Sequence, residues 1–172
     1  MEYKPLPIGV ENFEDMITND YYYVDKTLFI KELIDKKGKV NLFTRPRRFG
    51  KTLTLSMVQY FFEKQKGSAY LFDGLNIMYA GEKYSSEINK YPVINITLKN
   101  VECSKYEDSF KMLRKELIRE FGRHSYLLKS NKLGDGKKAL YADLINAKAT
   151  EEEYSSGYAQ IKVYQNGTSR SR

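Results

Sequence analysis

Residues 40–57 read VNLFTRPRRFGKTLTLSM, and this stretch decides the fold that the chain is expected to have. The run from Val40 to Phe43 follows a turn and is partly β-branched and aromatic, a pattern typical of a short buried strand. From Lys51 to about Lys64, apolar residues gather on one side of a helix. The stretch therefore predicts a strand, a loop and a helix in succession.

The loop closes with Gly50, Lys51 and Thr52, the last three residues of a phosphate-binding loop. In such a loop, backbone N–H groups surround phosphate oxygens at a helix N-terminus, a lysine reaches the outer phosphates, and a Ser or Thr hydroxyl binds Mg²⁺. The strict pattern G-x-x-x-x-G-K-[ST] is not met, because Arg45 stands where the first glycine is usual. Arg45 and Arg48 must then adopt backbone angles that glycine reaches more cheaply, although their charge favours a polyphosphate ligand. The residues alone leave a nucleotide site and a basic turn as open interpretations.

The composition is that of a globular protein. The 172 residues, 41% of them hydrophobic, suffice for one domain, which we expect over residues 1–165 with a polar tail at 166–172. No segment is long and apolar enough to span a membrane, and the N-terminus resembles no targeting peptide, so we expect a cytoplasmic protein without membrane contact. Since Cys103 and His124 are the sole residues of their types, a His/Cys metal site is not expected.

The charge is basic. A net charge of +7 and a pI near 9.2 favour an anionic partner, with nucleotide phosphates and nucleic acid both open. Positive residues concentrate at 45–51, 111–123 and 129–138. The second group is interleaved with acidic residues, which is typical of a solvated helix face.

The remaining secondary structure follows from periodicity and breakers. Residues 2–24 are rich in Pro, Gly, Asn and aromatic residues and are expected to be extended. Asp25 can cap a helix that Gly38 ends, and YPVINITLKNV at residues 91–101 contains a second predicted strand. Three further helices are predicted over residues 106–121, 137–149 and 150–164.

Three segments together resemble a known family. They are LPIGVENFEDMITNDYYYVDKTLFIKELI at residues 6–34, NLFTRPRRFGKTLTLSMVQYFFE at 41–63, and YPVINITLK at 91–99. They resemble the N-terminal half of the predicted AAA-ATPase-like family of bacteria and archaea, which is related to the signalling and archaeal P-loop ATPases. In that family RPRRFGK[ST] is the form that the phosphate loop, or Walker A element, takes. The resemblance implies an α/β fold, an incomplete P-loop NTPase parallel sheet with flanking helices.

The resemblance also implies a site for ATP and Mg²⁺. Lys51 would contact the β and γ phosphates, and Thr52 would bind Mg²⁺. The nucleotide-binding residues would be Arg45, Pro46, Arg47, Arg48, Phe49, Gly50, Lys51, Thr52 and Leu53. A candidate pocket for the base would contain Ile8, Gly9, Tyr23, Asp25 and Lys26. For Asp25 a capping role, and for Tyr23 a place in the core, are equally open.

The catalytic element of this class is not found in the sequence. Hydrolysis requires a strand followed by Asp and commonly Glu, the Walker B element, and neither Asp73 in YLFDG nor Asp143 in LYADL fits that pattern. In the family, a strand such as LIDEYD would follow the helix that begins at residue 150. We therefore expect a truncated member that binds ATP without hydrolysing it and relies on a protein partner or on the rest of the ATPase fold. The alternatives are a basic nucleic-acid-binding module and a non-functional remnant.

Overall fold

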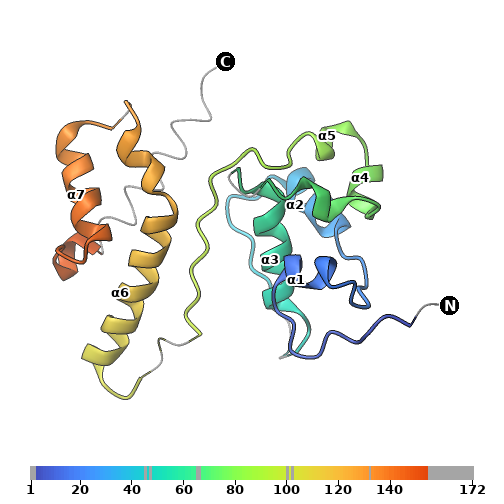
Figure 1. Ribbon diagram of the computed structural model, residues 1–172, viewed down its shortest axis with the longest axis horizontal. Helices are drawn as coiled ribbons and strands as arrows, with labels where there is room; N and C mark the ends of the chain where they lie inside the picture. The colour runs from blue at the N-terminus through green and yellow to red at the C-terminus, as the bar shows by residue number, and fades with distance from the viewer. Residues whose placement is uncertain are drawn as a thin grey trace. The chain divides into compact units, whose positions relative to one another are not determined.

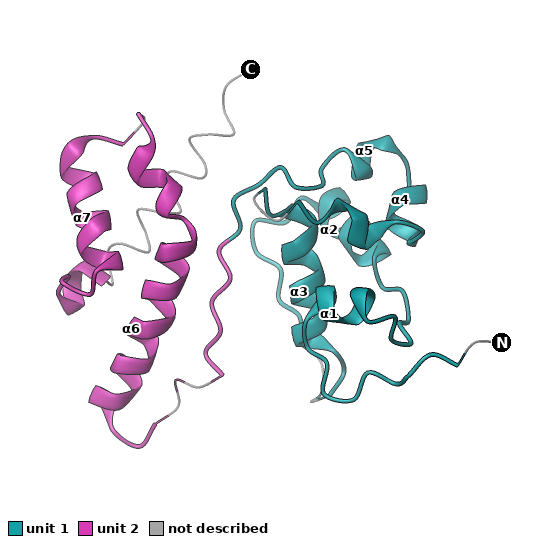
Figure 2. Cartoon of the chain, viewed as in Figure 1, with its two compact units in different colours: residues 1–93 teal, residues 94–172 magenta. Residues whose placement is uncertain are grey.

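The computed structural model describes residues 3–44, 46, 48–64, 67–99, 101, 103–131 and 133–154. The chain divides into two compact units, Met1–Val93 and Ile94–Arg172, which we call unit 1 and unit 2 (Figure 2). Each unit is built from helices and has a buried hydrophobic cluster of its own (Figure 1).

Unit 1 groups short helices around the longer helix α3, whose first turn carries the loop of interest (Figure 1). Its elements are α1 (Phe13–Thr18), α2 (Leu28–Lys36), α3 (Lys51–Phe62), the 3₁₀ helix η1 (Ala69–Phe72), α4 (Asn76–Tyr79) and α5 (Glu82–Ser85). Helices α1 and η1 pack on α3, and α2 packs on α4. The helices predicted after Asp25 and from Lys51 are therefore confirmed.

The core of unit 1 anchors the second half of α3. Phe61 is fully buried and lies edge-on to Phe72, with ring centroids 5.2 Å apart. Met57 and Tyr60 from the same helix are buried beside it. Burying a large apolar side chain stabilises a fold by about 1.5–3 kcal/mol, so these residues fix the helix while its first two residues stay exposed.

Helix α1 is a feature that the sequence interpretation missed. Residues 2–24 were expected to be extended, but Phe13–Thr18 is helical. The side chain of Asn12 caps this helix by accepting a hydrogen bond from the Glu14 N–H at 2.8 Å. An Asn cap followed by acidic residues in the first turn is a recognisable start signal, and the surrounding Pro and Gly residues concealed it.

Unit 2 consists of α6 (Tyr106–Arg123), η2 (Ser125–Lys129) and α7 (Asp135–Ile145), and residues 151–154 are also helical. The Tyr141 hydroxyl donates to the Phe121 carbonyl at 2.9 Å and joins α7 to α6. The Tyr154 hydroxyl donates to the Leu144 carbonyl at 2.8 Å. The long helix predicted over residues 106–121 is confirmed. Most of the helix predicted over 150–164, and the tail at 166–172, lie outside the described residues.

The expected fold class, an incomplete P-loop parallel sheet with flanking helices, is wrong for this structure. The described residues contain no strand, and β structure among them is limited to an isolated parallel bridge between Glu63 and Tyr91. Val40 and Leu42, expected in a buried strand, are 87% and 85% exposed. A strand needs a neighbour to pair its backbone groups, so β propensity within residues 40–43 does not by itself produce one.

The second predicted strand is replaced by contacts with a helix. The Asn95 N–H donates to the Glu120 carboxylate of α6 at 2.8 Å, while Ile94 and Ile96 pack against the hydrophobic cluster of unit 2. The apolar alternation of this segment is thus satisfied by a helical unit and a side-chain acceptor. Periodicity identifies a buried face but does not identify what covers it.

Candidate functional site

The loop of interest enters α3 through two residues in the left-handed backbone region. Gly50 has φ +70° and ψ +24° and is the N-cap of the helix, and Arg48 has φ +68°. A non-glycine residue in this region costs about 1–2 kcal/mol. The expectation that Arg48 adopts angles favourable to glycine is therefore confirmed, whereas Arg45 and Arg47 lie outside the described residues.

The first turn of α3 has no side-chain cap. Gly50 contributes no capping hydrogen bond, and no acidic residue occupies the first turn. The first N–H groups of a helix have no partner within the helix, and the aligned peptide dipoles make this end positive. The Gly50 carbonyl accepts from both the N–H and the hydroxyl of Thr54, each at 2.9 Å. The start of α3 is thus ordered and chemically suited to an anion.

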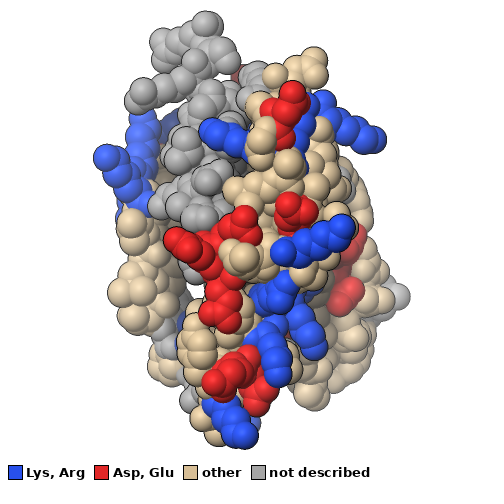
Figure 3. Space-filling model, turned by 90° about the vertical axis from the view of Figure 1, so that its left-hand side faces the viewer, with Lys and Arg blue, Asp and Glu red and all other residues tan. Residues whose placement is uncertain are grey.

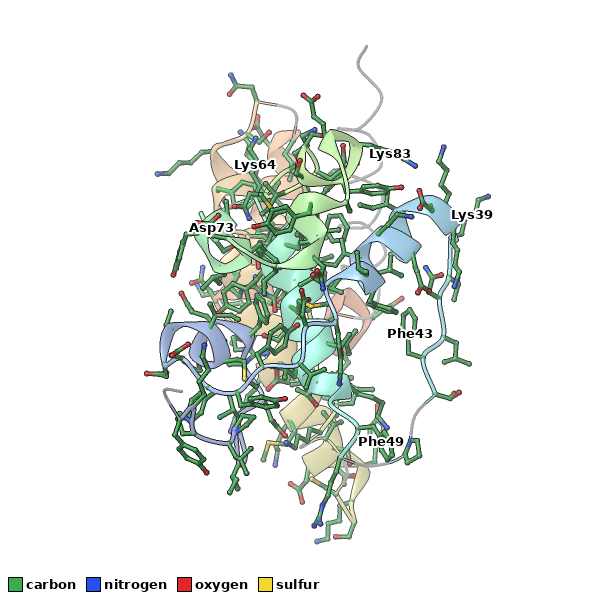
Figure 4. The ribbon with its side chains drawn as sticks, turned by 90° about the vertical axis from the view of Figure 1, so that its right-hand side faces the viewer. Lys39, Phe43, Phe49, Lys64, Asp73 and Lys83 are labelled. Atoms are coloured by element: carbon green, nitrogen blue, oxygen red, sulfur yellow. The ribbon has the colours of Figure 1, made fainter. Side chains whose placement is uncertain are left out.

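Lys51 and Thr52 lie on the solvent side of this first turn. Both are exposed, and Lys51 Nζ donates to the Pro46 carbonyl at 3.2 Å, so the lysine folds back over its own loop. Phe49 and Lys64 lie at opposite ends of α3 (Figure 4). Lys51 and Thr52 therefore lie together at the exposed start of α3, and Leu53 follows them in the same first turn.

A cavity of about 240 Å³ adjoins the same turn of α3. Its lining residues are Pro7, Met16, Tyr22, Tyr23, Val24, Lys26, Leu53 and Thr54. Lys26 is the sole charged residue in this set, and the rest are apolar or uncharged. Such a lining, with few polar groups, is characteristic of small-molecule sites, although the volume falls below the roughly 300–1,000 Å³ of sites for drug-sized ligands.

The structure separates the five residues suggested as a base pocket. Tyr23 and Lys26 line the cavity, whereas Ile8 is 90% exposed and Gly9 and Asp25 are not among the lining residues. The suggested pocket did not include Pro7, Met16, Tyr22, Val24 or Thr54, which also line the cavity. Met16 lies in a segment that was expected to be extended but forms helix α1.

Tyr23 belongs to both the cavity and the core. Its ring lies 5.6 Å from the Phe13 ring, edge to face. Burial raises the pKa of the Tyr23 hydroxyl to about 12, so the side chain is an uncharged phenol near neutral pH. The predicted core role of Tyr23 and its predicted pocket role are compatible.

Asp25 is a cap, but not of the helix that follows it. One carboxylate oxygen accepts from the Thr27 N–H and hydroxyl, both at 2.7 Å, and the other accepts from the Asn76 N–H at 2.8 Å. The Thr27 hydroxyl in turn accepts from the Ile77 N–H at 3.1 Å. Asp25 and Thr27 therefore hold the start of α4 against the start of α2.

The residues present fit Mg²⁺ only as a partner of bound phosphate. Among the described residues, no group of three His, Cys, Asp or Glu side chains is placed to hold a metal ion. Thr52 offers an exposed hydroxyl at the start of α3. Mg²⁺ in nucleotide sites takes few protein ligands and completes its shell with phosphate oxygens and water, which a lone hydroxyl can accommodate.

Basic residues on α6 are largely paired with acids of the same helix. Lys111 pairs with Asp108 at 3.5 Å and Arg119 with Glu116 at 2.6 Å. On the face drawn in Figure 3, positive and negative side chains are interspersed. Nucleic-acid binding relies on basic residues concentrated on one surface, and the paired charges of α6 instead agree with the solvated face predicted for residues 111–123.

The chain is similar to a curated protein over part of its length and matches a family model over most of it. A curated protein from Azotobacter chroococcum mcd 1, named "Uncharacterized protein in vnfD 5'region", is 44% identical over 78 residues, which are 45% of this chain and 14% of that protein. The chain thus matches about a seventh of that relative's length. No solved structure matches the chain. Within the described parts of the chain, no helix has the length and hydrophobicity to cross a bilayer. The model of the family described as "Predicted AAA-ATPase" matches residues 7–162, and the chain belongs to this family.

Proposed function

We propose that the chain binds ATP with Mg²⁺ at residues 45–53 and the adjoining cavity. The observation that carries the proposal is the start of α3, where a left-handed Gly50 leads into an uncapped first turn beside an apolar cavity. The first N–H groups of a helix have no partner within the helix, and the positive end of its dipole faces them, so a helix N-terminus is a ready anion site. Membership of the predicted AAA-ATPase family makes a nucleotide the anion that best fits this position.

Each part of the nucleotide has a counterpart in the chain. The backbone N–H groups after Gly50 donate to phosphate oxygens, and Lys51 leaves the Pro46 carbonyl to bind the outer phosphates. The Thr52 hydroxyl oxygen would coordinate Mg²⁺, and the ion would supply positive charge that neutralises the phosphates. The base enters the cavity against Tyr23 and Leu53, and a volume near 240 Å³ suits one ring system better than a whole nucleotide.

The proposal is for binding, without turnover by this chain. An attacking water must be oriented by a carboxylate or amide close to the γ phosphate. Asp143 belongs to α7 in unit 2, and Asp73 directly follows η1. The first turn of α3 contains no acidic residue. None of these positions reproduces the strand-borne carboxylates that the family resemblance leads one to seek.

Calorimetric titration of the chain with Mg·ATP tests the proposal. A hydrogen bond to a charged group contributes about 1.5–3 kcal/mol, so Lys51→Ala should weaken binding by roughly 10- to 150-fold. Lys64→Ala removes the same charge at the opposite end of α3 (Figure 4) and is the matched control. Equal affinities for wild type, Lys51→Ala and Lys64→Ala would refute the assigned site.

A further inference from the structure

The tripeptide Asp25-Lys26-Thr27 points its side chains to two different places. Asp25 and Thr27 accept hydrogen bonds from the first two N–H groups of α4, at 2.8 Å and 3.1 Å. Lys26, between them, reaches the loop at the start of α3: a methyl group built on Gly50 would lie 3.7 Å from Lys26 Nζ. Thr27 is fully buried. The backbone that carries Lys26 is therefore fixed from both sides.

Lys26 is an exposed side chain whose surroundings differ from those of the lysines that form ion pairs in unit 1. Lys31 and Lys83 both pair with Asp35, and Lys4 pairs with Asp20. Among the described residues, no carboxylate lies within ion-pair distance of Lys26, which is one of the residues that line the cavity. Its ammonium group thus stands at the boundary between an apolar cavity and the phosphate loop.

The position is electrostatically unfavourable without an anion. Lys26 approaches the start of α3 in space, and Arg48 and Lys51 flank Gly50 in the sequence. All three cations are therefore near the positive end of α3, where the helix dipole disfavours a cation. No acid in the first turn offsets them. An anion bound at the start of α3 would offset this positive charge and accept charge-assisted hydrogen bonds.

We propose that Lys26 is a phosphate-binding residue supplied from outside the loop, with Asp25 and Thr27 as the residues that position it. This inference rests on the proposed function and adds to it. A ligand whose ring occupies the cavity has its phosphates at the cavity's charged edge, where Lys26 and the first turn of α3 meet. Lys26 therefore contacts phosphate, not the base.

Three ligands distinguish a phosphate-binding role of Lys26 from a base-binding role. Mg·ATP, Mg·tripolyphosphate and adenosine are titrated into the full chain carrying Lys26→Met, Lys26→Arg, Lys51→Ala or Lys64→Met. Lys26→Met should weaken ATP and tripolyphosphate by the same factor, about 10- to 100-fold, and leave adenosine unchanged. Lys26→Arg should retain most of the affinity because it keeps the charge. Lys64→Met removes an equal charge at the far end of α3 and should match wild type.

Each other result overturns a specific statement. If Lys51→Ala weakens ATP binding but Lys26→Met does not, the Lys26 proposal is wrong and the proposed function stands. Loss of adenosine affinity with unchanged tripolyphosphate affinity would make Lys26 a base contact and also overturn the proposal. If wild type binds neither ATP nor tripolyphosphate, the proposed function and this inference fail together.

Discussion

Replacing Glu120 should destabilise unit 2 far more than its place on a charged helix suggests. The residue is only 3% exposed, and its carboxylate accepts from the Asn95 N–H at 2.8 Å and from Arg123 Nη1 at 2.7 Å. His124 Nε2 lies 3.5 Å away. Burial by itself would raise the pKa of Glu120, but the hydrogen bonds from His124 and Asn95 and the charge of Arg123 together lower it below its ordinary 4.5.

The magnitude follows from the two hydrogen bonds that the carboxylate accepts. Glu120→Ala removes the acceptor of the Asn95 N–H and the carboxylate that pairs with the partly exposed Arg123, and losing hydrogen bonds to a charged group costs about 1.5–3 kcal/mol. Glu120→Gln keeps an acceptor for Asn95 but loses the charge, so its cost should be about 1–3 kcal/mol. Glu116→Gln is the control on the same helix, because it removes an i,i+3 pair with the half-exposed Arg119, worth at most about 1 kcal/mol.

Urea unfolding at pH 7, monitored by circular dichroism, measures these differences in the free energy of unfolding. Hydrogen exchange of the N–H groups at residues 94–97 tests whether the loss of stability is located there. Because the folded-state pKa of Glu120 is depressed, its stabilising contribution is present above the unfolded pKa and is lost as the pH falls below 4.5. The difference in the free energy of unfolding between wild type and Glu120→Gln should therefore become smaller below pH 4.5. A cost for Glu120→Ala within about 0.5 kcal/mol of wild type would refute the reasoning.

Three further predictions concern unit 1. Purified chain should release no phosphate from ATP above the level of the Lys51→Ala variant, and turnover near 1 per second that disappears in that variant would reveal missed catalytic groups. Arg48→Gly relieves about 1–2 kcal/mol of backbone strain and adds about 0.5–1 kcal/mol of chain entropy cost, so thermal stability should change little while ATP affinity falls; a rise in affinity would show that strain dominates over charge. Thr27→Val should lower the free energy of unfolding by about 1–3 kcal/mol, because the buried Ile77 N–H loses its acceptor, and an unchanged urea midpoint would contradict this.

Local signals in the sequence were the reliable ones. The helix that starts at Lys51 and the one from Tyr106 to Arg123 follow from apolar spacing of three and four, which depends only on residues within the helix. The left-handed conformation of Arg48 was expected because this residue lies in a loop whose backbone angles glycine adopts more cheaply. These features need no distant partner, so one sequence is enough to predict them.

Strands failed because pairing is not a local property. Val40 and Leu42 have the side chains of a buried strand but are exposed, since no described segment lies beside them as a second strand. Ile94 and Ile96 lie in the second predicted strand, yet they pack against the helical hydrophobic cluster of unit 2 and not in a sheet. The resemblance to a P-loop family supplied the expectation of a sheet, and no residue within either segment could test it.

Cavity residues were predicted only where the chain places them next to a recognisable motif. Tyr23 and Lys26 lie in a segment that the family resemblance had marked, whereas Met16 enters the cavity from a helix that the sequence interpretation missed. In the sequence, Thr54 is one more hydroxyl residue of an amphipathic helix. In the structure its hydroxyl donates a hydrogen bond to the Gly50 carbonyl, and Thr54 lines the cavity. Whether Met16 and Thr54 line the cavity therefore depends on how α1 and α3 are placed in the fold, which the sequence pattern alone does not give.

The absence of a sheet from the described residues bears less on the proposed site than on the fold. The loop conformation is set by Gly50 and Arg48 in the left-handed region, and the helix behind it is anchored by Met57 and Phe61 in an aromatic core. Lys26 reaches the loop from a segment fixed by α4. None of these restraints passes through residues 40–43. Binding of tripolyphosphate, which needs only the loop and its cations, is therefore the measurement least dependent on how that segment is paired.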